Sequence, residues 1–222
     1  MLLKHGLAGL THKAAGGGGA LTLLATDSFT FTSNASNYTF SAMDIGTASA
    51  TRVVYASVWG GILAASGNTT ATIGGVTATQ VTRLLFRADD NAELTVFKAT
   101  VPTGTTADVV VTYPATYFGT LCMTCSVDGV TSEAAVTYEA DPATGLTMDT
   151  SVTNGDILIV GAACVNGPDL GVSGSTQVVL SDINTDDVGF YGVDEITTTE
   201  TKSISSSTTL SLPHGGLTVV IS

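Results

Sequence analysis

The chain has 222 residues, of which 12% are charged and 44% are hydrophobic, and 7 basic against 19 acidic residues give it a formal net charge of −12. So acidic a chain lacks the clustered cations that bind a nucleic-acid backbone, and so apolar a chain is not an acidic disordered tail. No run approaches the roughly 20 apolar residues of a membrane-spanning helix, and the length fits one large β domain or two small ones.

The first 26 residues differ in charge from the rest. They contain Lys4 and Lys13 and no acid, so they carry +2, whereas five basic and nineteen acidic residues give the remainder −14. Short segments fluctuate by two charges by chance, but an arm of this sign also suits contact with an acidic surface. Polar residues and glycines interrupt the apolar start, which argues against a secretory signal peptide.

We therefore expect residues 1–26 to form an extended anchoring arm, with the four glycines 16–19 as a flexible hinge. Its leucines would contact partner subunits, and its lysines would meet acidic groups. The expected partner-binding residues are Leu2, Leu3, Lys4, Leu7, Leu10 and Lys13. The alternative is a tail that contacts nothing.

From Asp27 onward, alternation of apolar and polar residues between turn residues predicts short strands. Residues 28–32 form the first, and the apolar run 52–59 indicates a central strand buried on both faces. Residues 71–79 place two β-branched arms around Gly74 and Gly75, which predicts a tight hairpin. Residues 83–90 have room for one helical turn at most.

Two further runs, 93–100 and 107–113, flank a turn at 101–104 and predict a second hairpin. A strand follows at 121–127, and 141–145 is expected to be a loop because of its proline and glycine. A turn at 154–156 leads into 157–164, the most apolar run of the chain. The remaining predicted strands are 177–180, 188–196, 198–205 and 217–221.

A loose internal symmetry relates the runs 52–59 and 156–164, since turn residues precede each and glycine-rich hairpins follow each. Their separation is too long for a blade or solenoid repeat and suits two sheets, each built around one apolar strand. We therefore predict an all-β fold in which residues 27–222 form a single antiparallel β-sandwich of the jelly-roll type.

Three cysteines are present, and an odd count argues against a disulfide framework. Cys122 and Cys125 have the spacing of redox and zinc sites, but on a strand positions i and i+3 face opposite sides. They are expected to be ordinary half-buried thiols, as no further zinc ligand lies near them in the sequence.

Catalytic residues are not expected. His214 is the only histidine outside the arm, and its turn-like surroundings predict a solvated loop residue. Asp182, Asn184 and Asp186 alternate as in the start of a calcium loop, but the glycine and glutamate that such a loop requires are missing. They are weak calcium candidates beside the simpler interpretation of a polar turn, and no cofactor is expected.

Aromatic residues supply the one other candidate site. Trp59, the only tryptophan, is expected to fill the core, because it is flanked by apolar and glycine residues. The alternative is a sugar-binding platform formed by Trp59, Tyr117, Phe118 and Tyr191.

The order of runs 52–59, 71–79, 93–112 and 154–160, after a glycine-rich start, resembles small structural proteins of tailed bacteriophages and phage-like particles. The resemblance implies a non-enzymatic virion component on the particle surface, either a capsid decoration or head fibre or a tail-associated fibre. It implies homo-oligomers, where a trimer fits a fibre and a pentamer fits a capsid vertex. The alternative function is a carbohydrate-binding receptor-recognition module on a phage or bacterial surface.

Overall fold

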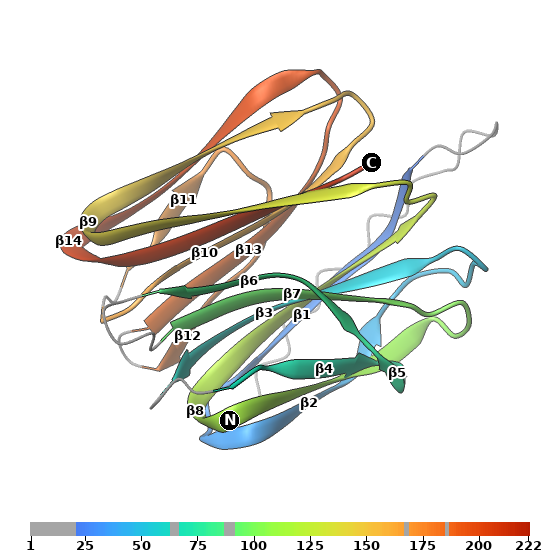
Figure 1. The fold of residues 1–222 in the computed structure, drawn as a ribbon, viewed down its shortest axis with the longest axis horizontal. Coiled ribbons are helices and arrows are strands. Elements are labelled where there is room, and N and C mark those ends of the chain that lie inside the picture. Colours follow the sequence, from blue (N-terminus) through green and yellow to red (C-terminus); the bar gives the residue numbers. More distant parts are fainter. Residues whose placement is uncertain (1–20, 63–66, 87–91, 167–168, 185–186) are drawn as a thin grey trace.

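The computed structural model describes residues 21–62, 67–86, 92–166, 169–184 and 187–222, and within these ranges all regular structure is β-strand (Figure 1). The strands are β1 (Thr22–Phe31), β2 (Ala35–Asp44), β3 (Val53–Ile62), β4 (Thr70–Ile73), β5 (Val76–Thr77), β6 (Thr79–Phe86), β7 (Ala92–Thr100), β8 (Thr106–Asp128), β9 (Glu133–Val152), β10 (Ile157–Cys164), β11 (Gly171–Ser173), β12 (Gln177–Asn184), β13 (Asp187–Glu195) and β14 (Glu200–Ile221).

The strands form two antiparallel sheets that pack face to face, which confirms the predicted β-sandwich. The first sheet has the order β5-β4-β8-β3-β7-β6, with β1 and β2 also paired to β8. The second has the order β11-β14-β10-β13-β12, with β9 also paired to β14. The apolar strands β3 and β10 thus lie inside different sheets, as the symmetry of the sequence predicts.

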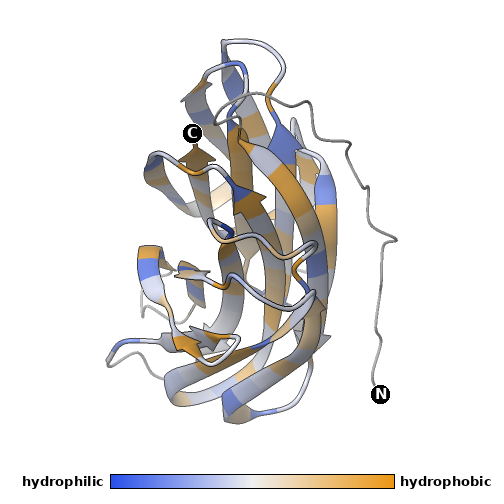
Figure 2. Ribbon diagram, turned by 90° about the vertical axis from the view of Figure 1, so that its right-hand side faces the viewer, coloured by the Kyte–Doolittle hydropathy of each residue, from blue (hydrophilic) through white to orange (hydrophobic). Residues whose placement is uncertain are grey.

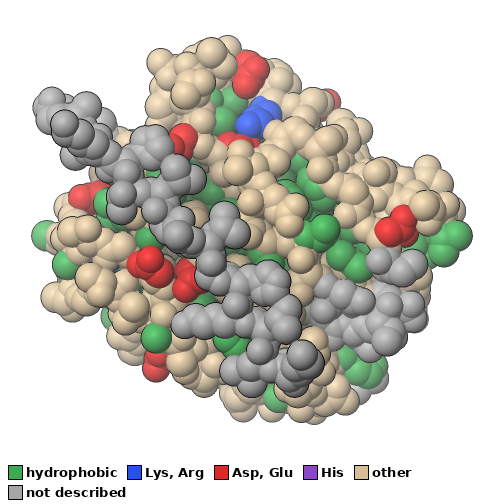
Figure 3. Space-filling model, turned by 180° about the vertical axis from the view of Figure 1, so that it is seen from behind, with side chains coloured by type: hydrophobic (Ala, Val, Ile, Leu, Met, Phe, Trp, Pro, Cys, Tyr) green, Lys and Arg blue, Asp and Glu red, His purple; other side chains and the backbone are tan. Residues whose placement is uncertain are grey.

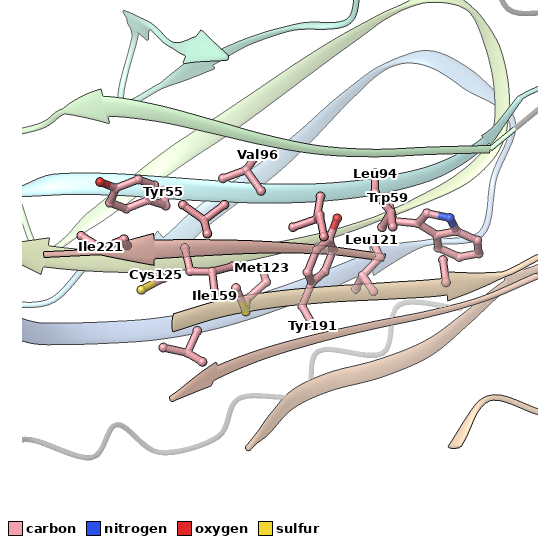
Figure 4. Close-up of a cluster of buried hydrophobic side chains, with 14 of the residues drawn as sticks. Tyr55, Trp59, Leu94, Val96, Leu121, Met123, Cys125, Ile159, Tyr191 and Ile221 are labelled. Atoms are coloured by element: carbon pink, nitrogen blue, oxygen red, sulfur yellow. The ribbon is translucent and has the colours of Figure 1, made fainter. Parts of the chain in front are cut away.

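The core between the sheets combines aromatic rings of one sheet with glycines of the other. Trp59 of β3 is fully buried there (Figure 4). A Cβ atom on Gly189 of β13 would lie 2.5 Å from its indole. A Cβ on Gly215 of β14 would likewise lie 2.4 Å from the ring of Phe86. These rings therefore pack directly on bare backbone, and the expectation that Trp59 fills the core is confirmed.

Each sheet also folds over itself along its longest strand. The first half of β8 pairs with β2 and β4, whereas its second half pairs with β1 and β3. Side chains of the first half, such as Val109, pack against Val54 and Val58 on the outer face of β3 and form a second core. The strand β14 folds the second sheet in the same way and encloses a third core. Hydrophobic positions accordingly run along the long strands through the middle of the body (Figure 2).

The two sheets have the same connectivity apart from β5, which has no counterpart, and β9, which takes the places of both β1 and β2. The strand β3 lies between β7 and the second half of β8, and β10 lies between β13 and the second half of β14. The strands β6 and β12 extend the sheets beyond β7 and β13. The first half of β14 lies between β9 and β11, as that of β8 lies between β2 and β4. The described chain therefore consists of two topologically equivalent halves, 22–128 and 133–221.

The equivalence extends to single residues. Val53 is opposite Thr100 and Val127, and Ile157 is opposite Glu195 and Ile221 at the same places in the second sheet. The residue before each of them closes the same turn. The amide of Arg52 donates to the carbonyl of Ser49 at 3.2 Å, and that of Asp156 donates to the carbonyl of Thr153 at 3.0 Å. Register thus fixes which residues of the two halves correspond.

Arg52 holds the turns at one end of the first half together. Its buried guanidinium donates hydrogen bonds to six backbone carbonyls. The acceptors are Val101 at 2.8 Å, Ile45 at 3.1 Å, Gly46 and Thr47 at 2.9 Å, Thr103 at 2.8 Å and Gly104 at 3.0 Å. One side chain therefore fixes two separate turns at the start of β3.

Of the two hairpins predicted in the first half, the structure confirms one. The hairpin at 71–79 is confirmed as β4 and β5, with Gly74 and Gly75 at φ 59° and 77°. The predicted hairpin of 93–100 with 107–113 is wrong, since β7 pairs with β3 and β6 instead of β8. Residues 83–86 belong to β6, so the described part of the segment 83–90 contains no helical turn.

Two segments of the second half that were expected to be a loop and a turn lie within strands instead. Residues 141–145 lie within β9, at a break in register with β14 that accommodates the proline. His214 lies in β14 and is buried, so the expected solvated loop residue is wrong. The strand β1 begins at Thr22, and the end of the segment 1–26 therefore belongs to the first sheet.

Candidate functional site

Several candidate residues lie where the structure gives no account of them. Residues 1–20, which include Leu2, Leu3, Lys4, Leu7, Leu10 and Lys13, are outside the described part, and so is Asp186. Asp182 and Asn184 lie in β12, but their side chains are not described. Among the described residues, no three acids, histidines or cysteines gather as metal ligands, and no helix could cross a membrane.

The cysteines are as the sequence predicts in orientation. Cys122 belongs to the outer core of the first half and Cys125 to the core between the sheets, so the two thiols face opposite sides of β8. Both are fully buried rather than half-buried, and burial raises the pKa of each thiol well above its usual value. This pair therefore has neither the shared face nor the thiolate character of a redox or zinc site.

The aromatic platform is not formed. Trp59, Tyr117 and Tyr191 are fully buried, and only Phe118 is partly exposed. The exposed face in Figure 3 consists mostly of uncharged polar side chains and backbone, with scattered acids. These four residues therefore do not form a sugar-binding surface.

A buried polar cluster lies in the first half around Glu93 of β7. Its Oε2 accepts hydrogen bonds from Thr69 at 2.8 Å and from Tyr117 at 2.9 Å, and it pairs with Arg83 at 3.0 Å. Its Oε1 accepts a hydrogen bond from Thr95 at 2.6 Å. Both carboxylate oxygens are thus occupied, and the cluster joins β6, β7, β8 and the approach to β4.

Two tyrosine rings complete this cluster. Tyr113 and Tyr117 stack with their centroids 3.7 Å apart, and the hydroxyls of Tyr113 and Thr120 are hydrogen-bonded at 2.7 Å. Burial raises the pKa of both tyrosines, so they remain neutral donors. The first half is therefore filled at this end by its own polar and aromatic side chains.

The second half has an open depression of about 690 Å³ between β11, β12, β13 and β14. It combines apolar side chains with four hydroxyl groups and one carboxylate. The lining residues are Asp169, Leu170, Gly171, Leu180, Ser181, Val188, Ser207, Thr208 and Thr209. A volume of this size is in the range of small-molecule sites.

Hydrogen bonds hold the polar wall of the depression. The hydroxyl of Thr209 donates to Asp169 at 3.2 Å, and that of Thr208 lies 3.1 Å from Nε2 of His214. Nδ1 of His214 lies 3.3 Å from the hydroxyl of Ser206. Burial lowers the pKa of His214, so the neutral ring links these two hydroxyls from behind the wall.

Comparisons with known proteins do not assign a family. No protein-family model and no curated protein sequence matches the chain. Among solved structures it is similar to the crystal structure of the conserved protein of unknown function PA5104 from Pseudomonas aeruginosa PAO1. That match has 11% sequence identity over 96% of this chain and 86% of the other, with a TM-score of 0.31, which is too low to support any argument.

Proposed function

We propose that this protein is a non-enzymatic structural component on the surface of a virion or phage-like particle, attached by its N-terminal arm. The observation that carries the proposal is that the first 26 residues contain two lysines, no acid and a run of four glycines at 16–19. Those residues carry the charge opposite to that of the body. The resemblance of the strand runs to phage structural proteins supports the same function.

In this proposal the arm carries the attachment and the β body is displayed. Leucines at positions 2, 3, 7 and 10 fill grooves between partner subunits, while Lys4 and Lys13 meet acidic groups and set the orientation. Copies on a particle multiply weak contacts into strong overall attachment. A trimer would suit a head or tail fibre, and a pentamer would suit a decoration at a capsid vertex.

The test is a truncated protein that begins at Leu21, directly before β1. We expect it to fold with an unchanged circular dichroism spectrum but to fail to attach to particles that lack the native copy. A full-length variant with Lys4→Glu and Lys13→Glu separates charge from length and should attach more weakly. Equal attachment of the truncated and full-length proteins would move the anchoring surface to the β body and overturn the proposal.

A second candidate function is glycan binding, and the depression of the second half favours it. Its wall of hydroxyls and one carboxylate beside leucine and valine side chains suits a ligand with both polar and apolar faces. A surface protein of a particle can have both functions, since the arm and the depression are separate parts of the chain.

A further inference from the structure

We propose that the depression of the second half binds one neutral sugar residue, at the position that the first half fills with its own tyrosine ring. The inference rests on the second candidate function, glycan binding. It follows from the residue correspondence between the two halves.

Strand register identifies the matching positions. Thr120 is opposite Gly60 in the first half, and His214 is opposite Cys164 at the same place in the second. Thr112 lies between Asn37 and Thr70, as Ser207 lies between Gly145 and Gly171. The next residues along β8 and β14, Tyr113 and Thr208, therefore correspond.

The corresponding side chains make the same contact. In the first half the hydroxyls of Tyr113 and Thr120 are 2.7 Å apart, and in the second the hydroxyl of Thr208 is 3.1 Å from His214. The difference lies in size, because the first half places a phenol ring where the second places only a threonine. The partner of Thr208 in this contact, His214, also has a ring, but that ring is fully buried behind the wall of the depression.

Two further replacements remove bulk on the opposite wall. Glu93 corresponds to Val188, since Glu93 lies opposite Gly60 and Val188 lies opposite Cys164, the residue that matches Gly60. Arg83 corresponds to Leu180, two positions further along the β6–β7 and β12–β13 pairs. The second half thus has valine, leucine and threonine where the first has glutamate, arginine and tyrosine. The depression is the space that these shorter side chains leave.

The contents of the first half indicate which ligand fits this space. There the volume contains a hydroxylated six-membered ring, Tyr113, stacked on a second ring and hydrogen-bonded to a threonine. A pyranose has the same ring size, apolar C–H faces for Leu170, Leu180 and Val188, and hydroxyls for Asp169 and Ser207. The acidic lining residue and the net charge of −12 disfavour an anionic sugar.

The experiment is saturation-transfer NMR with the methyl glycosides of glucose, galactose, mannose and N-acetylglucosamine at about 10 mM, a concentration suited to the weak affinity of a single sugar. We expect the full chain to give a signal with at least one of them. The variant Ser207→Trp, which fills the depression, should abolish it. The matched control Thr201→Trp, at an exposed position of the same strand, should keep it.

Each result bears on a different claim. A signal that survives Ser207→Trp in a folded variant overturns the site but leaves glycan binding in place. No signal with any of the four sugars overturns both the site and glycan binding. It does not affect the proposed attachment through the arm, which the truncated protein tests separately. If Ser207→Trp does not fold, Leu180→Arg restores the bulky residue of the first half at an exposed position and should reduce the signal at least fivefold. An unchanged signal in Leu180→Arg would overturn the site.

Discussion

Replacing Arg52 by methionine should destabilise the protein more than any comparable change at an exposed charge. The substitution keeps most of the apolar stem and removes all six hydrogen bonds that the guanidinium donates to backbone carbonyls. Four of these carbonyls belong to residues that are partly or fully exposed, so water can replace the lost donor. Those of Ile45 and Val101 belong to buried residues.

The two buried carbonyls set the magnitude. An unsatisfied buried polar group costs about 1–3 kcal/mol, and the carbonyl of Ile45 keeps one partner because Ser126 donates to it at 2.8 Å. Only the carbonyl of Val101 is left without a donor, so the expected loss of unfolding free energy is about 1–3 kcal/mol. In a domain of this size each kcal/mol lowers Tm by about 2–4 °C, which predicts a Tm lower by about 2–12 °C.

Urea denaturation of the wild type, Arg52→Met and Arg52→Lys measures the effect. The lysine variant keeps the charge but has three donors in place of five, so its midpoint should fall between the other two. An unchanged slope with denaturant would show that the native state alone is affected. A loss below about 0.5 kcal/mol for Arg52→Met would refute the view that this side chain holds the turns together.

Three other outcomes are expected. Iodoacetamide should modify none of Cys122, Cys125 and Cys164 in the native protein and all three after unfolding; rapid native labelling would contradict their burial. Because the pKa of His214 is lower in the folded protein, the unfolded chain takes up the proton at a higher pH than the folded protein does as the pH falls. The stability that this residue supports is therefore present above about pH 6.5 and declines below it. His214→Gln should therefore show a smaller stability difference between about pH 7 and pH 5 than the wild type, and an equal difference would exclude this role. Gly189→Ala should cost about 1–3 kcal/mol in thermal unfolding because its methyl would overlap the facing indole, and a neutral effect would show that the core yields there.

Features that depend on local pattern were predictable. The alternation of apolar and polar residues predicted most strands, and two glycines in sequence predicted the hairpin at Gly74 and Gly75. The spacing of Cys122 and Cys125 predicted that they face opposite sides, since the side chains of a strand alternate whatever its partners are.

The buried cluster and the depression were missed. One sequence signal for the cluster was available. Glu93 lies in a strand run rich in apolar residues, where an acidic side chain would be buried and would require hydrogen-bond donors. Those donors come from Thr69, Arg83 and Tyr117, which are up to 24 residues away in the sequence. Spacing alone does not reveal such a set, because the strands that carry it meet only in the folded sheet.

The sequence by itself determined that the chain is all-β, that two apolar strands are its centres and that its cysteines are structural. Only the tertiary structure decided that β7 pairs with β3 rather than β8, that β8 and β14 each fold a sheet over itself, and that His214 is buried. Alternation is a property of one strand and needs no partner. Pairing and burial depend on which distant strands cover each face, and that choice is made by the free energy of the whole assembled core.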